Sequence, residues 1–508
     1  MEMTTEIVGR VFGGDISEIR FRASHDVDIR VGEMLVIDDE SRSFLVRLTD
    51  IEYGAEEARD EWVARQAGRP PQSDEASMQK RLFKVGVCVP LGIMEDGGLT
   101  KAKTIPRHLA QVRRVSLEDL AFLKGKLGDL RAGMMRSGDR VLDLTVGIQN
   151  EALPMHVGIF ATTGMGKSNL MKCLALSCMR SRKCGFLILD PHGEYYDGGG
   201  AGKKGLRDFA GAGEALLVLS SRKLDGPHSA LKISSSEIDI PDLANLYEFT
   251  GAQVECLQTA QYKLGNNWLA ALLERDVSKL MGDLNGRFGE GTISVIKRRL
   301  ESVFRFDLIT TDQKHSVTKQ VISALDQGMV VLVDTSNMFE AEELLVSTVL
   351  TRAIFERNRE LYAERKEFAR IPSMLVALEE AQRVLGQAKG TVFAQIAREG
   401  RKFKLGICAV TQQPKLINEE IISQFNTLFV LGLADRRDRD ILRNSAKQDV
   451  AMLENEIQML MPGEALIASP FTPFAIPARI DLFETYLEEA NAAIAPKTAK
   501  PTRDQGFF

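Results

Sequence analysis

The sequence predicts an α/β protein in which a parallel sheet follows a small β-barrel and is interrupted by a bundle of helices. Three observations support this fold class. Apolar runs typical of buried strands alternate with helical patterns from residue 157 onward. Short strand-like runs separated by turn residues fill the first 106 residues, which is typical of a small barrel. Between residues 238 and 327 the apolar spacing is helical and strand patterns vanish.

Length and composition set limits on the class of protein. With 508 residues the chain is too long for one core, and about two to four domains are expected. The net charge of −5 gives no global sign of nucleic-acid binding, although a ring can hide a basic channel inside an acidic exterior. The six cysteines form no C-x2-C pair, so we expect buried free thiols in a reducing cytosol. The N-terminus resembles no signal peptide, and no apolar run approaches the roughly 20 residues of a membrane span. We therefore expect a cytoplasmic protein without a membrane partner.

The N-terminal region predicts strands and turns but no catalytic cluster. Strands are expected at 6–12, 16–22, 34–38, 44–51 and 83–90, with a helix and loop inserted over 55–80. We interpret this region as an assembly or docking module. Residues 115–130 are then expected to form a helix with Ser116 as its N-cap, and 133–144 a strand pair.

A phosphate-binding loop follows the strand that ends at Phe160. The pattern is Ala161-x4-Gly166-Lys167-Ser168, and a helix is expected over 169–180. Small residues let backbone N–H groups surround a phosphate, and the helix N-terminus adds the positive end of its dipole. Lys167 is expected to reach the β- and γ-phosphates, and the Ser168 hydroxyl to take a Mg²⁺ position. The expected nucleotide-binding residues are Ala161, Thr162, Thr163, Gly164, Met165, Gly166, Lys167, Ser168 and Asn169.

Acidic side chains follow two later strands. Strand 184–190 ends in Asp190, with Glu194 shortly after, and both are candidates for the nucleotide or Mg²⁺ neighbourhood. The alternative is a capping Asp and a solvated Glu. Strand 373–378 runs into Glu379 and Glu380, a Walker-B-type ending in which we assign Glu379 to the metal and Glu380 to the attacking water.

Basic and amide side chains follow the acidic pair. In the helix expected over 392–402, Arg398 and Arg401 share a polar face, where ring NTPases often present an arginine to the neighbouring γ-phosphate. The alternative is a solvated basic helix end. The strand after it ends at Gln412, a candidate sensor of the γ-phosphate. A further strand at 427–433, a terminal hairpin, a helix at 482–494 and an extended tail complete the chain.

These motifs in this order resemble the HerA branch of the HerA/FtsK ATPases. The likeness rests on the P-loop, Asp-Pro-His-Gly-Glu-Tyr, Glu-Glu-Ala-Gln, Arg-Glu-Gly-Arg-Lys and Thr-Gln-Gln-Pro, and covers essentially the whole chain. It implies a RecA-like core with a HAS-like barrel. The implied domains are a barrel at 1–115, a core in two parts at 116–237 and 328–480, a helical bundle at 238–327, and a C-terminal extension at 481–508.

The resemblance also implies an activity. It implies a homo-hexamer that uses ATP and Mg²⁺ to move double-stranded DNA through its pore. A NurA-type nuclease would dock on the barrel face, and the pair would act in DNA end resection and recombinational repair. Lys167, Glu380, Gln412 and one of Arg398 and Arg401 would carry the chemistry. Three positions depart from the family pattern: Ala161 replaces Gly, Glu379 replaces Asp, and Gln382 stands where His is frequent.

Other functions remain open at this level. The ring could serve an antiviral defence complex with a different effector, or act as a scaffold whose ATP use is regulatory. A membrane-anchored pump is disfavoured by the lack of a membrane segment. The candidate DNA contacts are Lys389, Lys203 and Lys204, for which an ordinary solvated lysine is the alternative.

Overall fold

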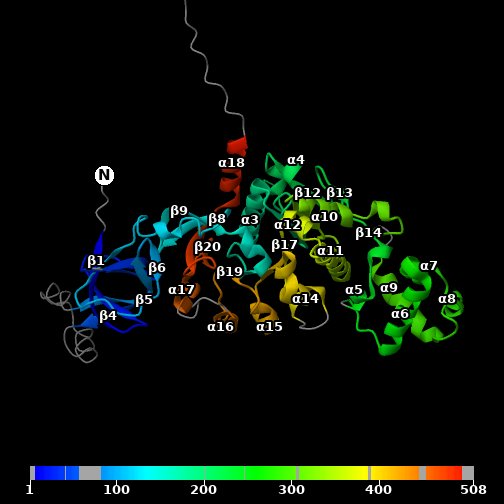
Figure 1. Cartoon of the computed structure of the whole chain (residues 1–508), viewed down its shortest axis with the longest axis horizontal. Helices are drawn as coiled ribbons and strands as arrows, with labels where there is room; N and C mark the ends of the chain where they lie inside the picture. Colours follow the sequence, from blue (N-terminus) through cyan, green and yellow to red (C-terminus); the bar gives the residue numbers. More distant parts are fainter. Residues whose placement is uncertain are drawn as a thin grey trace, which may run out of the picture. The chain divides into compact units, whose positions relative to one another are not determined.

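The computed structural model describes residues 6–40, 42–55, 82–200, 202–244, 246–304, 308–386, 391–445 and 453–494. Its chain divides into two compact units, and many of their elements are labelled in Figure 1. The first unit comprises Met1–Lys167, Glu380–Ala388 and Ile407–Ile480. The second comprises Ser168–Glu379, Lys389–Gly406 and Asp481–Phe508.

The first unit begins with a closed barrel of six strands. Their order is β2-β1-β7-β3-β4-β5, and an antiparallel pairing between β2 and β5 closes the ring, while β6 pairs with β5. Closure pairs the edges that an open sheet would leave exposed. The bounds are β1 Ile7–Gly14, β2 Ile19–Ala23, β3 Met34–Asp39, β4 Arg42–Ala55, β5 Leu82–Glu95, β6 Gly98–Thr100 and β7 Gln111–Arg114.

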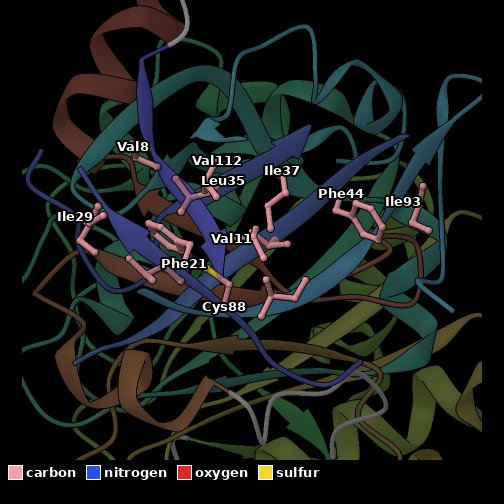
Figure 2. Packing of buried hydrophobic residues seen from close by; sticks show 14 residues of the cluster. Val8, Val11, Phe21, Ile29, Leu35, Ile37, Phe44, Cys88, Ile93 and Val112 are labelled. Atoms are coloured by element: carbon pink, nitrogen blue, oxygen red, sulfur yellow. The ribbon is translucent and has the colours of Figure 1, made fainter. Parts of the chain in front are cut away.

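Alternate side chains of these strands fill the barrel interior. Figure 2 shows the cluster, in which Phe21, Phe44 and Cys88 are buried among aliphatic side chains. Successive side chains of a strand point to opposite faces of the sheet, so the remaining side chains lie on the barrel exterior.

Seven further strands of the first unit pair in the order β18-β10-β19-β20-β21-β8-β9. β10 lies parallel to both β18 and β19, whereas the pairs from β19 to β9 are antiparallel. β10 and β18 are buried along their whole length, as expected of strands covered on both faces. The bounds are β8 Leu130–Ser137, β9 Arg140–Ile148, β10 Val157–Phe160, β18 Leu405–Thr411, β19 Thr427–Val430, β20 Glu464–Ala468 and β21 Ile476–Ile480.

Short helices connect the strands of the first unit. They are η1 Ala121–Leu123, η2 Asn150–Met155, α13 Gln382–Leu385, η8 Pro414–Leu416, α15 Glu419–Ile422, α16 Arg436–Ser445 and α17 Glu454–Met459.

A buried ion cluster links the barrel to the rest of the first unit. Glu456 on α17 accepts hydrogen bonds from Arg47 of β4 and from Arg136 of β8, each at 2.7 Å. Arg47 is 1% exposed and Glu456 3%. Burial lowers the pKa of the Arg47 guanidinium, and the Glu456 carboxylate opposes that shift. Two buried cations therefore depend on one carboxylate.

The second unit contains a parallel sheet in the order β13-β12-β16-β11-β17. At Gly185 on β11 an added Cβ would lie 2.7 Å from the Leu325 carbonyl oxygen, so α10 packs closely on this strand. The strand bounds are β11 Cys184–Asp190, β12 Leu216–Ser220, β13 Ser229–Ala230, β16 Val330–Asp334 and β17 Ser373–Leu378. The helices outside the bundle are α3 Lys167–Ser181, η3 Leu206–Asp208, α4 Ala212–Ala215, η6 Gln313–His315, α10 Thr318–Asp326, α11 Glu340–Leu361, α12 Arg365–Arg370, α14 Val392–Glu399, η7 Gly400–Phe403 and α18 Phe483–Ile494.

A helical bundle projects from this unit through a two-stranded neck. β14 (Ile233–Ser234) leads in, and β15 (Ile309–Thr310) pairs with it in parallel on the way out. Arg352 of α11 holds the bundle base through both carboxylate oxygens of the buried Asp242. The helices are η4 Ser235–Glu237, α5 Ile240–Ala244, α6 Gly251–Leu264, η5 Gly265–Asn267, α7 Trp268–Glu274, α8 Val277–Asp283 and α9 Glu290–Val303.

Most expected elements are present, and the α/β fold with its N-terminal barrel is confirmed. All six cysteines are buried and none forms a disulfide, as expected. Among the described helices, none combines the length and apolar character that a bilayer crossing requires. The expected insertion at 55–80 and the tail from residue 495 lie outside the described residues, apart from residue 55 itself.

The helix predicted over residues 115–130 is wrong. Only η1 is helical there. The Ser116 N–H donates to the Asp119 carboxylate and the Asp119 N–H donates to the Ser116 hydroxyl, so the expected cap forms, but it begins a turn and not a long helix. Gly125 and Gly128 then adopt φ of +78° and +79°, which a right-handed helix excludes.

The buried ion cluster generates a stability prediction. Glu456→Gln preserves size but leaves the Arg47 and Arg136 charges buried without a counter-charge. We expect a loss of about 3–5 kcal/mol of stability, measured by calorimetry as a lower unfolding midpoint. The control is Glu95→Gln, whose 3.8 Å pair with Arg42 is half-exposed and should contribute less than about 1 kcal/mol. Equal midpoints for the two variants would contradict the prediction.

Candidate functional site

The phosphate-binding loop begins where β10 ends. Phe160 pairs with Thr411 of β18 on one side and with Val430 of β19 on the other. Immediately after it, the Ala161 N–H donates to the Thr411 carbonyl at 3.3 Å, and the Thr162 N–H to the Gly432 carbonyl at 3.0 Å. The ends of two flanking strands therefore fix the start of the loop.

The loop leaves space for a phosphate. Gly164 and Gly166 have φ of +83° and +104°, which L-residues rarely adopt. A Cβ at Gly164 would meet nothing within 4 Å, and one at Gly166 would meet only the Gly463 N–H, at 3.9 Å. Lys167 is half-buried, and its Nζ lies 3.4 Å from the Ala161 carbonyl oxygen, folded back over the loop. These features fit the triphosphate that the sequence predicts.

The strand end beside the loop presents amide side chains. The Thr163 hydroxyl donates to Oε1 of Gln412, directly after β18. Gln412, the predicted sensor, is thus hydrogen-bonded to the P-loop. A movement of Gln412 or of the loop would change this bond.

Glu380 belongs to the same unit and has an unusual backbone. Its φ is +48°, uncommon for a residue with a side chain and typical of strained functional sites. Gln382 Nε2 donates to Glu380 Oε2 at 2.7 Å, and Gln382 Oε1 accepts from the Thr411 hydroxyl at 2.6 Å. A carboxylate only accepts and a hydroxyl donates here, so both bonds agree on one orientation of the amide. Gln382 therefore joins Glu380 to the end of β18.

In the second unit, Asp190 is enclosed by its own turn. Its carboxylate is fully buried and accepts the backbone N–H groups of the four residues from His192 to Tyr195, at 2.8–3.3 Å. Burial raises the pKa of the Asp190 carboxyl, and these N–H groups oppose the shift. These contacts match the alternative in which Asp190 caps the turn that follows its strand. Glu194 is exposed.

Tyr195 holds the other acid of the pair. Its hydroxyl donates to Glu379 Oε1, and its ring is 2% exposed. Burial, and then the Glu379 carboxylate, raise the pKa of Tyr195 well above its ordinary value. The phenol therefore keeps its proton and orients the Glu379 carboxylate.

The Asn169 side chain bonds to the backbone at the start of α18. Its Nδ2 donates to the Asp481 carbonyl at 2.7 Å, and its Oδ1 accepts from the Phe483 N–H at 2.9 Å. The amide therefore fixes the start of α18, while Ser168 lies in the first turn of α3.

The basic candidates are exposed. Arg398 on α14 and Arg401 on η7 lie on the polar side of an amphipathic segment. Lys203 and Lys204 lie exposed in the loop before η3, with Lys204 3.8 Å from Asp208. Lys389 lies outside the described residues.

Sequence reasoning gave no role to Gln382, Thr411 or Tyr195. Gln382 and Tyr195 each end a motif that the sequence did single out, and Thr411 is the last residue of a strand. Their positions in the sequence are distinctive, but the bond between Thr411 and Gln382 spans 29 residues and that between Tyr195 and Glu379 spans 184.

These features define a P-loop ATPase. A glycine-rich loop opens between a buried parallel strand and a helix, and acidic and amide side chains stand at other strand ends. Residues 130–354 match the family described as the central domain of helicase HerA. The central part of the chain is therefore similar to the HerA family.

Relatives along most of the chain agree. A DNA double-strand break repair helicase HerA of Pyrococcus furiosus is 26% identical over 430 residues, covering 74% of each chain. One of Sulfurisphaera tokodaii is 26% identical, covering 77% of this chain and 76% of its own. Among solved structures, the plasmid coupling protein TrwB with ADP and Mg²⁺ is a more distant likeness at 14% identity and a TM-score of 0.46, covering 70% of this chain and 94% of its own.

The loop geometry generates a binding prediction. Gly166→Ala places a side chain at φ +104°, a strain of about 1–3 kcal/mol that the loop relieves only by moving. We expect affinity for a fluorescent ATP analogue to fall at least about ten-fold. The control is Gly213→Ala, on a helix where an added Cβ meets nothing. Unchanged affinity for Gly166→Ala would contradict the assignment of the loop.

Proposed function

We propose that this protein is an ATP-driven, hexameric double-stranded DNA translocase and helicase. It acts with a NurA-type nuclease in DNA end resection and recombinational repair. The observation that carries the proposal is the open P-loop, whose Thr163 is bonded to Gln412 and whose flanking strand end is bonded through Gln382 to Glu380. The relatives' names, DNA double-strand break repair helicase, support the DNA role.

The roles follow from charge and position. Backbone N–H groups of residues 161–166 and the Lys167 ammonium bind and neutralise the phosphates. Glu380 accepts a proton from the attacking water, and Gln382 holds that carboxylate in position. When the γ-phosphate leaves, the hydrogen-bond partners of the Gln412 side chain change. The bond between Gln412 and Thr163 then alters the position of the P-loop.

Ser168 and Glu379 would hold Mg²⁺. The residues fit this ion, because a hydroxyl and a carboxylate are oxygen ligands. Bound there, Mg²⁺ would neutralise phosphate charge. Tyr195 is then a positioning residue that limits the rotation of a carboxylate one methylene longer than Asp.

Assembly would complete the site. Arg398 and Arg401 are exposed, so one of them can reach the γ-phosphate bound by a neighbouring subunit and stabilise its developing charge. The same ring would place basic residues such as Lys203, Lys204 and Lys389 where duplex phosphates pass. The barrel is the surface on which the nuclease would dock.

The test is ATP hydrolysis with and without linear duplex DNA. We expect the duplex to raise the rate of hydrolysis. Lys167→Ala should abolish hydrolysis, because the Lys167 ammonium neutralises negative charge on the β- and γ-phosphates. Stimulation of the nuclease should disappear with it. Lys124→Ala, which removes an exposed lysine of the same unit, is the control. DNA-independent turnover, with nuclease stimulation intact in Lys167→Ala, would instead indicate a scaffold.

A further inference from the structure

A turn at the edge of the sheet in the first unit lies directly beside the P-loop. β20 runs antiparallel to β19, so β20 begins at the sheet edge where β10 and β19 end and where the P-loop starts. The residues from Met461 to Glu464 lead into β20. β21 runs antiparallel to β20, so its last residues, Arg479 and Ile480, return to the same edge. The topology therefore places this turn and the end of β21 beside the phosphate-binding residues.

The turn from Met461 to Glu464 has a fixed conformation. The Glu464 N–H donates to the Met461 carbonyl at 2.9 Å, and Glu464 Oε2 accepts from the Met461 N–H at 3.0 Å. Pro462 restricts φ at the second position, and Gly463 supplies a φ of +82° at the third, as a type II turn requires. A ligand that packs on such a turn orders little additional backbone, so binding costs little conformational entropy.

Backbone hydrogen bonds attach this turn to the P-loop and to β21. The Gly463 N–H donates to the Met165 carbonyl at 3.2 Å, and the Gly463 carbonyl accepts from the Ile480 N–H at 2.8 Å. A Cβ at Gly166 would lie 3.9 Å from the Gly463 nitrogen, and a Cβ at Gly463 would lie 3.9 Å from Arg479 Nε. Gly463 is therefore close to both the phosphate-binding loop and the Arg479 side chain.

The side chains at this place are apolar or planar, and they are exposed. Met461 is 62% exposed, Pro462 is exposed, and the Arg479 side chain is 51% exposed. The Arg479 guanidinium lies 3.6 Å from Oε1 of the buried Glu464, so a fixed carboxylate offsets its charge. An arginine compensated in this way still offers its planar face, on which an aromatic ring can stack. These properties fit a heterocyclic ring better than a further phosphate group.

We propose that the turn from Met461 to Glu464 and the Arg479 guanidinium form the site for the purine base of the bound nucleotide. The base would pack on Met461 and Pro462 and stack on the guanidinium, while the P-loop holds the phosphates. This inference rests on the proposed binding of ATP at the P-loop, and it adds the residues that bind the base. Because packing and stacking increase with the area of the ring, the site favours purines over pyrimidines.

The test is isothermal titration calorimetry of the full chain with a non-hydrolysable ATP analogue and with inorganic tripolyphosphate, which has no base. We expect Arg479→Ala to weaken binding of the analogue about five-fold and Met461→Ala about three-fold, because stacking and apolar contact are lost. Tripolyphosphate affinity should stay within about two-fold, which also shows that the variants are folded. Arg479→Lys should bind the analogue as weakly as Arg479→Ala does, because an ammonium keeps the charge but has no planar face.

Matched controls lie in the same unit. Met459→Ala removes a methionine of α17 that is 60% exposed, and Arg140→Ala removes an exposed arginine of β9. Both should bind the two ligands as the wild type does.

Two outcomes would overturn the base site. One is wild-type affinity for the analogue in both Arg479→Ala and Met461→Ala. The other is an equal loss of tripolyphosphate affinity in Arg479→Ala, since the guanidinium would then bind a phosphate. Lys167→Ala should weaken both ligands, and this result distinguishes a failed base site from a failed assignment of the P-loop.

Discussion

The carbonyl groups at the ends of β18 and β19 set the position of the P-loop. The loop has no regular structure of its own, so it is held by the bonds from Ala161 to Thr411, from Thr162 to Gly432 and from the Gly463 N–H to the Met165 carbonyl at 3.2 Å. Its two left-handed glycines need this support, because an unsupported glycine loop has many conformations to lose. The nucleotide site therefore depends on strand register far along the chain.

The same strand end also orders an acid. Thr411 uses its carbonyl for the loop and its hydroxyl for Gln382, which in turn binds the Glu380 carboxylate. A strained backbone persists only where its surroundings fix it, and here the Glu380 carbonyl accepts from the Arg383 N–H at 2.9 Å and the Ala381 N–H donates to the Val410 carbonyl at 3.1 Å. In the proposed mechanism Thr411 therefore couples the two parts of the site. A movement of the P-loop changes the position of the Glu380 carboxylate, and a movement of that carboxylate changes the position of the loop. Gln382 can serve because an amide donates and accepts at once, as a neutral imidazole also does.

The sequence revealed the fold class, the barrel and the P-loop because each has a local signature: strand alternation, helical spacing and a glycine pattern. It failed at residues 115–130, where Ser116 and Asp119 form the reciprocal bonds of a helix start but glycines with positive φ follow. It could not predict the bonds of Gln382 to Thr411 and of Tyr195 to Glu379, because these are long-range contacts without a spacing rule. Asn169 shows the same limit, because its amide bonds to Asp481 and Phe483, more than 300 residues away.

In the proposed mechanism the Thr411–Gln382–Glu380 chain positions the carboxylate that activates water. The most direct measurement of this role is the steady-state ATPase rate of Gln382→Leu beside its affinity for an ATP analogue. We predict that kcat falls about 100-fold, the lower end of general-base contributions, while affinity stays within about two-fold. Thr411→Val should give a smaller loss, and the double variant no more than Gln382→Leu alone, because both break one chain. A wild-type kcat for Gln382→Leu, or parallel loss of rate, affinity and stability, would contradict the account.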